Sequence, residues 1–424
     1  MTNNVNFFGP KTSILTAGSG LNFGQEDGKE PGIALRRSHK MRFQFSTATQ
    51  IHFGPGTVNQ ISPLAAKMGR RPIVLTGRNP ERATALIDAL AAEGMETARH
   101  PVIAEPTVDM ALEAVRKARR EACDLVIGIG GGSVIDTGKV VAALITNSGR
   151  LMDYLEVIGK ARPLVHPSAP YIAIPTTAGT GSEVTRNAVL GSPQHRVKVS
   201  MRSPYMLPDL AVIDPDLTLS LPSDITAVTG LDAFTQLMES FVSSQSNALT
   251  DGICREGLHR AARSLQKAYE NGDDLGAREN MCLASLFSGM ALANSKLGAV
   301  HGIAGPLGGM ISGAHGAICA ALLPHVMDTN IKAMRHRAAH SPVLERYNEL
   351  ARILTGSASA RAEDGIRWVK DLCQALQVKS LAPLGLVKAD FAALVAKSQK
   401  ASSMQGNPIR LTDEELMEIL RMAH

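Results

Sequence analysis

The chain has 424 residues, 44 % of them hydrophobic and 20 % charged, a composition typical of a globular protein with room for two folded domains. Its formal net charge of +5 is small and its lysines and arginines are scattered, which argues against a nucleic-acid partner. No apolar run reaches the roughly 18 residues of a membrane span, and MTNNVNFFGPKTSILTAGSG lacks the pattern of a signal peptide. We therefore expect a cytoplasmic protein without a membrane partner.

Cysteine usage points to a reducing compartment. The five cysteines are Cys123, Cys254, Cys282, Cys319 and Cys373. They are widely spaced, form no CxxC pair and lie in apolar or helical contexts, so buried thiols are the expected state. No activating motif precedes any of them, and a cysteine nucleophile is therefore not predicted.

The first half of the chain has the sequence pattern of an α/β protein. Residues 1–40 are rich in glycine, asparagine, serine and charge, which predicts a loose extension. From residue 41 to residue 221, short apolar runs alternate with amphipathic segments. This alternation predicts a parallel sheet with crossover helices, then a hairpin and a closing strand within 188–215. Strands are predicted over 71–77, 124–130 and 171–175, and helices over 78–94, 107–122 and 133–147.

The second half of the chain has a different sequence pattern. Pro222 and Ser223 open a long helical stretch, 225–244, and another helix, rich in small residues, follows at 277–298. Because no convincing strand follows, residues 222–424 are predicted to form an all-helical domain.

A glycine turn follows the predicted strand 124–130. Gly130, Gly131 and Gly132 lead into Ser133, where a helix starts. Glycines let a phosphate approach the backbone, and the N–H groups and partial positive charge of the helix start favour that phosphate. The alternative is a tight turn that binds nothing. The spacing is GGGSxxDxxK rather than the GxGxxG of the common dinucleotide fold.

Two other strand ends carry polar residues. In PTTAGTGSEVT, 175–185, hydroxyl and backbone N–H groups suit phosphate and ribose oxygens, although a capped polar loop is the alternative. In TGRNPERA, the strand ends at Gly77 and Arg78 follows. A small residue followed by arginine accommodates the 2′-phosphate of NADP, whereas the alternative is a solvated arginine at a helix start.

Possible metal ligands lie in the second half. Asp232 and Gln236 are four residues apart on a predicted helix and share a face, but a glutamine amide is a poor transition-metal ligand. His301 and His315 begin and end HGIAGPLGGMISGAH. They are too far apart for one helical turn, so a loop containing Pro306, Gly308 and Gly309 is expected to bring them together.

Taken together, these segments resemble the iron-containing (group III) alcohol dehydrogenase family, from about Phe43 to Leu420. The motifs GGGSVID, AIPTTAGTGSEVT, LPDLAVIDP, TGLDAFTQ and LLPHVM fit the order and spacing of that family. The resemblance implies an N-terminal α/β domain that binds a nicotinamide cofactor, a helical C-terminal domain and an active site in the cleft between them. Dehydroquinate synthase shares this broad fold. The family often forms dimers, and a homodimer is expected here.

The resemblance also implies roles for individual residues. Gly130 to Ser133 would hold the pyrophosphate. The metal ligands of the family, one aspartate and three histidines, correspond to Asp232, Gln236, His301 and His315, and a further family histidine near the substrate corresponds to Gly305. Residues expected to line the cofactor site are Asp136, Thr176, Thr177 and Thr180, with Gly77 and Arg78 at the ribose.

These correspondences predict an NAD(P)-dependent oxidoreductase that interconverts an alcohol and an aldehyde or ketone by hydride transfer, with NADP favoured by Gly77–Arg78. Three remaining ligands can still hold iron or zinc. A metal-independent reductase similar to maleylacetate reductase is an alternative, with Lys198, Lys296 or a histidine as the donor to the carbonyl. Two further alternatives are a cofactor-binding pseudoenzyme and a lyase related to dehydroquinate synthase.

Overall fold

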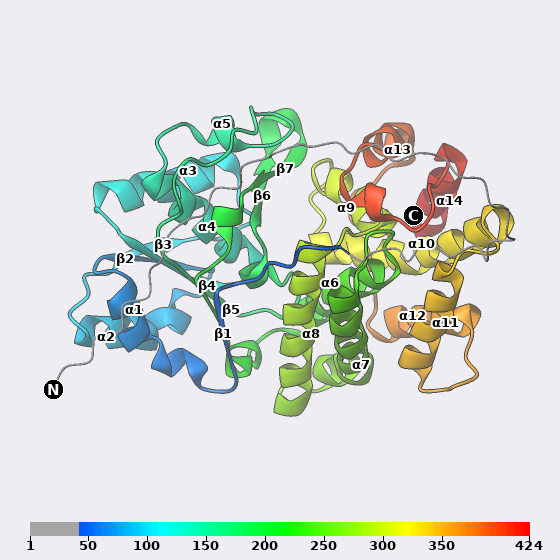
Figure 1. Ribbon diagram of the computed structural model, residues 1–424, viewed down its shortest axis with the longest axis horizontal. Coiled ribbons are helices and arrows are strands. Elements are labelled where there is room, and N and C mark those ends of the chain that lie inside the picture. The colour runs from blue at the N-terminus through cyan, green and yellow to red at the C-terminus, as the bar shows by residue number, and fades with distance from the viewer. Residues whose placement is uncertain (1–41) are drawn as a thin grey trace, which may run out of the picture. The chain divides into compact units, whose positions relative to one another are not determined.

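The computed structural model describes residues 42–424 (Figure 1). The loose extension predicted for residues 1–40 lies outside the described residues. The described residues from Phe43 to His424 form one compact unit. Within residues 42–424, no helix combines the length and the apolar character that a bilayer crossing requires.

A parallel sheet organises the first half of this unit. Its strands follow the order β1-β8-β5-β4-β2-β3, and every neighbouring pair is parallel. The central strands are buried along their whole length, as their continuous apolar runs predict. The parallel sheet is therefore confirmed. Its strands are β1 (Gln50–Phe53), β2 (Pro72–Thr76), β3 (Ala98–Pro101), β4 (Leu125–Gly130), β5 (Tyr171–Pro175) and β8 (Leu210–Ile213).

Helices connect these strands, and a hairpin precedes the last one. The predicted helix 78–94 begins instead with a 3-10 turn, Pro80–Ala83, before α2 starts at Thr84. The predicted hairpin is formed by β6 (Asn187–Ser192) and β7 (Val197–Arg202), which pair in antiparallel fashion, and β8 is the predicted closing strand. The helices are α1 (Ser62–Met68), α2 (Thr84–Ala92), α3 (Val108–Arg120), α4 (Gly132–Thr146) and α5 (Leu151–Tyr154).

Helices make up the second half, and the described residues after 222 contain no strand, as predicted. Helices α6, α7 and α8 pack against one another, and α10 packs against α6 and α9. The second-half helices are α6 (Ser223–Val242), α7 (Ala248–Glu270), α8 (Leu275–Asn294), α9 (Ala299–Gly308), α10 (His315–Arg337), α11 (Val343–Thr355), α12 (Ala362–Ala375), α13 (Phe391–Ser398) and α14 (Asp413–Ala423).

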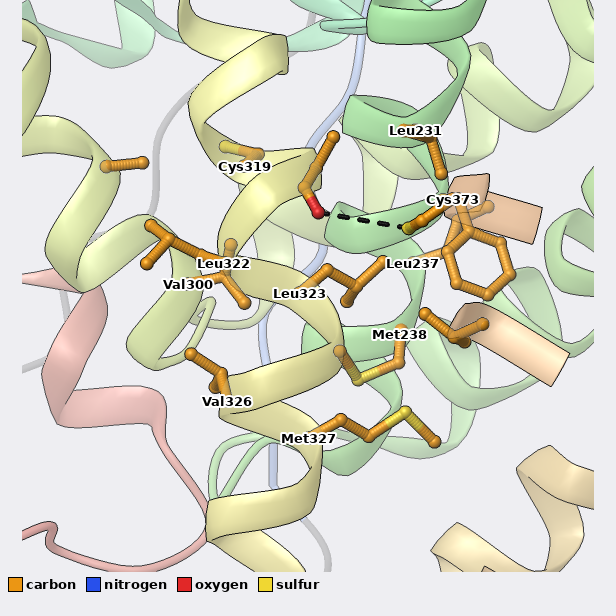
Figure 2. Close-up of a cluster of buried hydrophobic side chains, with 14 of the residues drawn as sticks. Leu231, Leu237, Met238, Val300, Cys319, Leu322, Leu323, Val326, Met327 and Cys373 are labelled. Atoms are coloured by element: carbon orange, nitrogen blue, oxygen red, sulfur yellow. Dashed lines mark hydrogen bonds between the residues drawn. The ribbon is translucent and has the colours of Figure 1, made fainter. Parts of the chain in front are cut away.

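The largest hydrophobic core lies among these helices. Figure 2 shows a part of it, in which Leu237 and Met238 of α6 lie close to Leu323 and Met327 of α10. Cys319 belongs to the same core and lies one turn further toward the start of α10. A rigid, dry core thus supports the start of α10.

The segment from His301 to His315 differs from its prediction as a loop. His301 lies in α9, which continues through Pro306 to Gly308, and His315 is the first residue of α10. Pro306 is tolerated because it lies near the end of this short helix, where few backbone hydrogen bonds are lost. The two histidines are therefore brought together by a turn between two helices.

Candidate functional site

Four polar side chains from three helices converge within the second half. Asp232 comes from α6, His301 from α9, and His315 and Cys319 from α10. Their potential ligand atoms all lie within 4.8 Å of one another. The structure therefore brings together three of the residues expected at the metal site and adds a cysteine that was not expected there.

The cluster is buried except at one residue. The His301 Nε2 lies 3.4 Å from the Asp232 Oδ1, and the His315 Nε2 lies 3.9 Å from the same oxygen. Asp232, His301 and Cys319 are each at most 7 % exposed, whereas the side chain of His315 is 33 % exposed. The site thus meets solvent on the side of His315.

Close packing between α6 and α10 sets this geometry. A Cβ atom on Gly316 would lie 2.3 Å from the backbone oxygen of Val228 in α6 and 3.4 Å from the Cβ of Asp232. Only glycine permits that approach. The residue after His315 therefore has to be small for the imidazole to reach Asp232.

Glu239 fixes the orientation of His301. Its Oε2 lies 2.7 Å from the His301 Nδ1, and its Oε1 accepts a hydrogen bond of 2.6 Å from the Val300 N–H. An Nδ1–H that donates to this carboxylate leaves the Nε2 lone pair directed at Asp232 and Cys319. Glu239 was not identified from the sequence, although it follows Asp232 by seven residues and shares its face of α6.

A buried oxygen without a partner marks the centre of the cluster. The Asp232 Oδ1 accepts no hydrogen bond, whereas the Oδ2 accepts one of 3.4 Å from the Gln236 Nε2. Leaving a buried carboxylate oxygen unpaired is costly. A divalent cation among these donors would remove that cost, so the residues present fit a metal.

The protonation equilibria follow the same geometry. Burial raises the pKa of Asp232, but the nearby imidazoles of His301 and His315 outweigh it, and the net pKa is lowered. Burial likewise raises the pKa of Cys319, but the imidazoles of His315 and His301 lower it below its ordinary value. By contrast, burial raises the pKa of Cys282 and Cys373 to about 12.

Cys319 was missed because its neighbours in the sequence are apolar. The expectation of a buried thiol is correct, since Cys319 is fully buried. Its spacing of four residues from His315 on one helix was the available signal, because residues at this spacing share a face.

The expected cofactor residues lie at the carboxyl ends of β2, β4 and β5, which are neighbours in the sheet. Gly131 caps α4, and its Cβ would lie 3.4 Å from the Thr177 side chain. A Cβ on Gly132 would lie 3.0 Å from the Thr180 side chain. The glycine turn, 130–132, therefore adjoins the loop that follows β5, residues 176–185, which we call the threonine loop. The start of α4 lies at this junction. Dinucleotides bind at such strand ends.

The carboxylate of Asp136 holds the threonine loop in place. Its Oδ1 accepts hydrogen bonds from the Ser182 hydroxyl and from the fully buried Lys139 ammonium, the latter at 3.3 Å. Its Oδ2 accepts a bond of 2.8 Å from the Val189 N–H. Asp136 thus acts on the expected cofactor site by positioning the loop that follows β5.

Gly77 and Arg78 directly follow β2, which ends at Thr76. A Cβ on Gly77 would meet no atom within 4 Å, so there is open space beside it. Arg78 is exposed, and its Nε donates a hydrogen bond of 2.7 Å to the Ile103 carbonyl. The guanidinium is therefore held at the carboxyl end of the sheet.

The two lysines considered as donors have other partners. The Lys198 Nζ pairs with the Glu105 Oε2 at 2.7 Å. The Lys296 Nζ donates to the Gln405 Oε1 at 2.6 Å and lies between α8 and α9. Lys296 therefore does not share a helix with His301, and neither lysine is held at the cluster by these contacts.

Glycine- and threonine-rich strand ends of this kind bind a dinucleotide, and carboxylate, imidazole and thiol donors bind divalent metals. The fold and the two candidate sites thus indicate an oxidoreductase with a nicotinamide cofactor and a candidate metal site. The chain belongs to the iron-containing alcohol dehydrogenase family. The family model described as iron-containing alcohol dehydrogenase matches residues 48–215, and the C-terminal model of the same family matches residues 226–424. The protein is an oxidoreductase that interconverts alcohols and aldehydes.

Similar proteins cover nearly all of the chain. The 1,3-propanediol dehydrogenase of Citrobacter freundii is 33 % identical over 401 residues, which cover 91 % of this chain and 100 % of that one. The structure of an alcohol dehydrogenase from Oenococcus oeni is 32 % identical with a TM-score of 0.83, over 90 % of this chain and 100 % of that one. A sulfoacetaldehyde reductase from Bifidobacterium kashiwanohense, in complex with NAD+, is 26 % identical with a TM-score of 0.80, over 90 % and 99 % of the two chains. These matches confirm the predicted family, fold and activity, and they argue against the lyase alternative.

Proposed function

We propose that the protein is a metal-assisted, NADP(H)-dependent alcohol dehydrogenase in which Asp232, His301 and His315 hold a divalent metal. The observation that carries the proposal is the buried Asp232 Oδ1, which has no hydrogen-bond partner and lies within 3.9 Å of two imidazole nitrogens. Residues 41–221 would bind the cofactor and residues 222–424 the metal and the substrate. The homodimer and the cytoplasmic location stay predictions.

When bound, the metal supplies Lewis-acid polarisation of the substrate oxygen. In the direction of reduction, a bound nicotinamide would supply the hydride for the carbonyl carbon and the oxygen would take a proton, so the products would be the alcohol and the oxidised cofactor. The N–H groups at the start of α4 would bind the pyrophosphate, and Glu239 would keep His301 in the tautomer with a free Nε2.

Gly305 leaves room beside this site. No atom lies within 4 Å of where its Cβ would be. Because glycine carries no acid, residue 305 would not supply the proton for the product oxygen, and solvent water would supply it. The space left by a missing imidazole also suits a substrate larger than ethanol.

The activity test uses purified protein, NADPH and a panel of aldehydes and keto acids. We expect oxidation of NADPH above that of a heat-killed control, loss of the rate after chelation, and its recovery when Zn²⁺ or Fe²⁺ is added back. A rate that survives complete removal of metal would support the second candidate, a metal-independent reductase, which the glutamine at position 236 favours.

The cofactor test uses Arg78→Ala. Loss of one charge-assisted contact to a 2′-phosphate is expected to weaken NADPH binding by about tenfold to a hundredfold. Binding of NADH should not change. The matched control is Arg71→Ala, which removes an arginine at the opposite end of β2. Fluorescence titration measures both affinities, and equal NADPH affinity in Arg78→Ala and the unmodified protein would exclude the 2′-phosphate assignment.

A further inference from the structure

The fourth ligand position of the proposed metal site lacks a suitable donor at residue 236. The Gln236 amide nitrogen is engaged with the Asp232 Oδ2, and its Oε1 has no hydrogen-bond partner. A neutral amide oxygen is a weak ligand for a transition metal. The family pattern of four protein ligands is therefore incomplete if only the positions expected from the sequence are counted.

Cys319 supplies a donor from another direction. Its Sγ lies 3.6 Å from the His315 Nε2 and 3.8 Å from the His301 Nε2, and the side chain is fully buried. Cys319 follows His315 by one turn of α10, so the helix presents both side chains to the same point. The Asp232 Oδ1, which has no hydrogen-bond partner, lies beside these donors and is independent evidence for a cation site.

The distances between the potential ligand atoms are close to the edges of a tetrahedral metal site. Bond lengths of about 2.0 Å to nitrogen or oxygen and about 2.3 Å to sulfur give tetrahedral edges of about 3.3 Å between N or O donors and about 3.5 Å between N and S. The corresponding separations here are 3.4 and 3.9 Å for the two imidazole–carboxylate pairs and 3.6 and 3.8 Å for the two imidazole–sulfur pairs. These four separations exceed the tetrahedral edges by at most about 0.6 Å, and all the potential ligand atoms lie within 4.8 Å of one another.

We propose that the thiolate of Cys319 is the fourth protein ligand of the metal, in place of residue 236, and that it makes the site prefer zinc to iron. The proposal rests on the proposed function, since it assumes a metal at this cluster. On binding, a metal–sulfur bond forms, the S–H bond breaks and the proton passes to water, with no change of oxidation state. Thiolate favours Zn²⁺ over harder cations. Zinc sites also expand to five ligands during catalysis, so four protein ligands are compatible with activity.

The absorption spectrum of bound Co²⁺ tests the metal–sulfur bond directly. The full-length protein is stripped of metal, reconstituted with one equivalent of Co²⁺, and its metal content and near-ultraviolet absorption are measured. We expect a thiolate-to-cobalt charge-transfer band in the unmodified protein that disappears in Cys319→Ser and Cys319→Ala. The matched control is Cys373→Ser, which removes another buried thiol whose partner is the Ala320 carbonyl and which should leave the band intact. Figure 2 shows both cysteines.

Each outcome decides a separate question. Stoichiometric cobalt binding without the band, or a band that persists in the Cys319 variants, would overturn Cys319 as a ligand and leave the metal site in place. No cobalt binding would overturn the metal site itself and the ligand with it. If the Cys319 variants do not fold, the spectra of the unmodified protein and of Cys373→Ser still test whether a thiolate other than that of Cys373 binds the metal. In competition between Zn²⁺ and Fe²⁺ without oxygen, the ratio of bound zinc to bound iron should fall at least about tenfold in Cys319→Ala.

Discussion

Asp232→Asn is expected to lower kcat/KM for aldehyde reduction by about a thousandfold, since loss of a metal's charge stabilisation costs about 4 kcal/mol. The substitution keeps the shape of the side chain but removes the negative charge from the centre of the cluster. Steady-state kinetics with saturating NADPH measure the effect. The control is Asp224→Asn, an exposed aspartate in the first turn of the same helix, which should not change the rate.

A second measurement separates loss of metal from loss of fold. The stripped Asp232→Asn protein should be less stable than the stripped parent, because the imidazoles of His301 and His315 outweigh burial, lower the pKa of Asp232 and so stabilise its carboxylate in the folded state. Metal at a thousandfold excess over its Kd should stabilise the parent by about 4 kcal/mol and leave the variant unchanged. Retained activity in Asp232→Asn would favour the metal-independent reductase instead.

Gly289→Ala is expected to reduce the free energy of unfolding by about 3 kcal/mol or more. Gly289 lies in α8, and a Cβ there would lie 2.1 Å from the backbone oxygen of Gly181 in the threonine loop. Gly181 itself has φ +59° and would place a Cβ 2.5 Å from the Gly289 nitrogen. Because backbone meets backbone, no side chain can rotate away to relieve the clash.

The matched control is Gly252→Ala in α7, where no atom lies within 4 Å of the added Cβ. That substitution should stabilise the protein by about 0.5–1 kcal/mol, as alanine does in a helix. Urea unfolding followed by circular dichroism measures both variants. A Gly289→Ala protein as stable as the parent would show that the loop and α8 can separate at little cost.

The central part of the sheet could be predicted from the sequence, but its edges could not. Strands β2, β4 and β5 are continuous buried apolar runs, which leave a clear signal. Strands β1 and β3 are four residues long, lie at the two edges and carry exposed positions, so neither has a continuous apolar run. Their position depends on pairing with a neighbour rather than on local pattern.

The residues of the candidate metal cluster could also be predicted only in part from the sequence. Asp232, His301 and His315 were identified from their order along the chain, and the structure brings them together. Glu239 and Cys319 carry the spacings i+7 and i+4 from two of these residues, but many core residues share those spacings. Their direction toward the cluster is set by the contact between α6 and α10, which is tertiary information.

The uneven exposure of the cluster has a kinetic consequence. His315 is its one partly exposed member and also the first residue of α10, so its release would break fewer contacts than release of a buried donor. Exchange of a bound ion with solution would therefore begin by release of His315, while the buried donors would remain in place. The rate at which a chelator empties the site would then report local opening of one helical turn rather than unfolding of the protein.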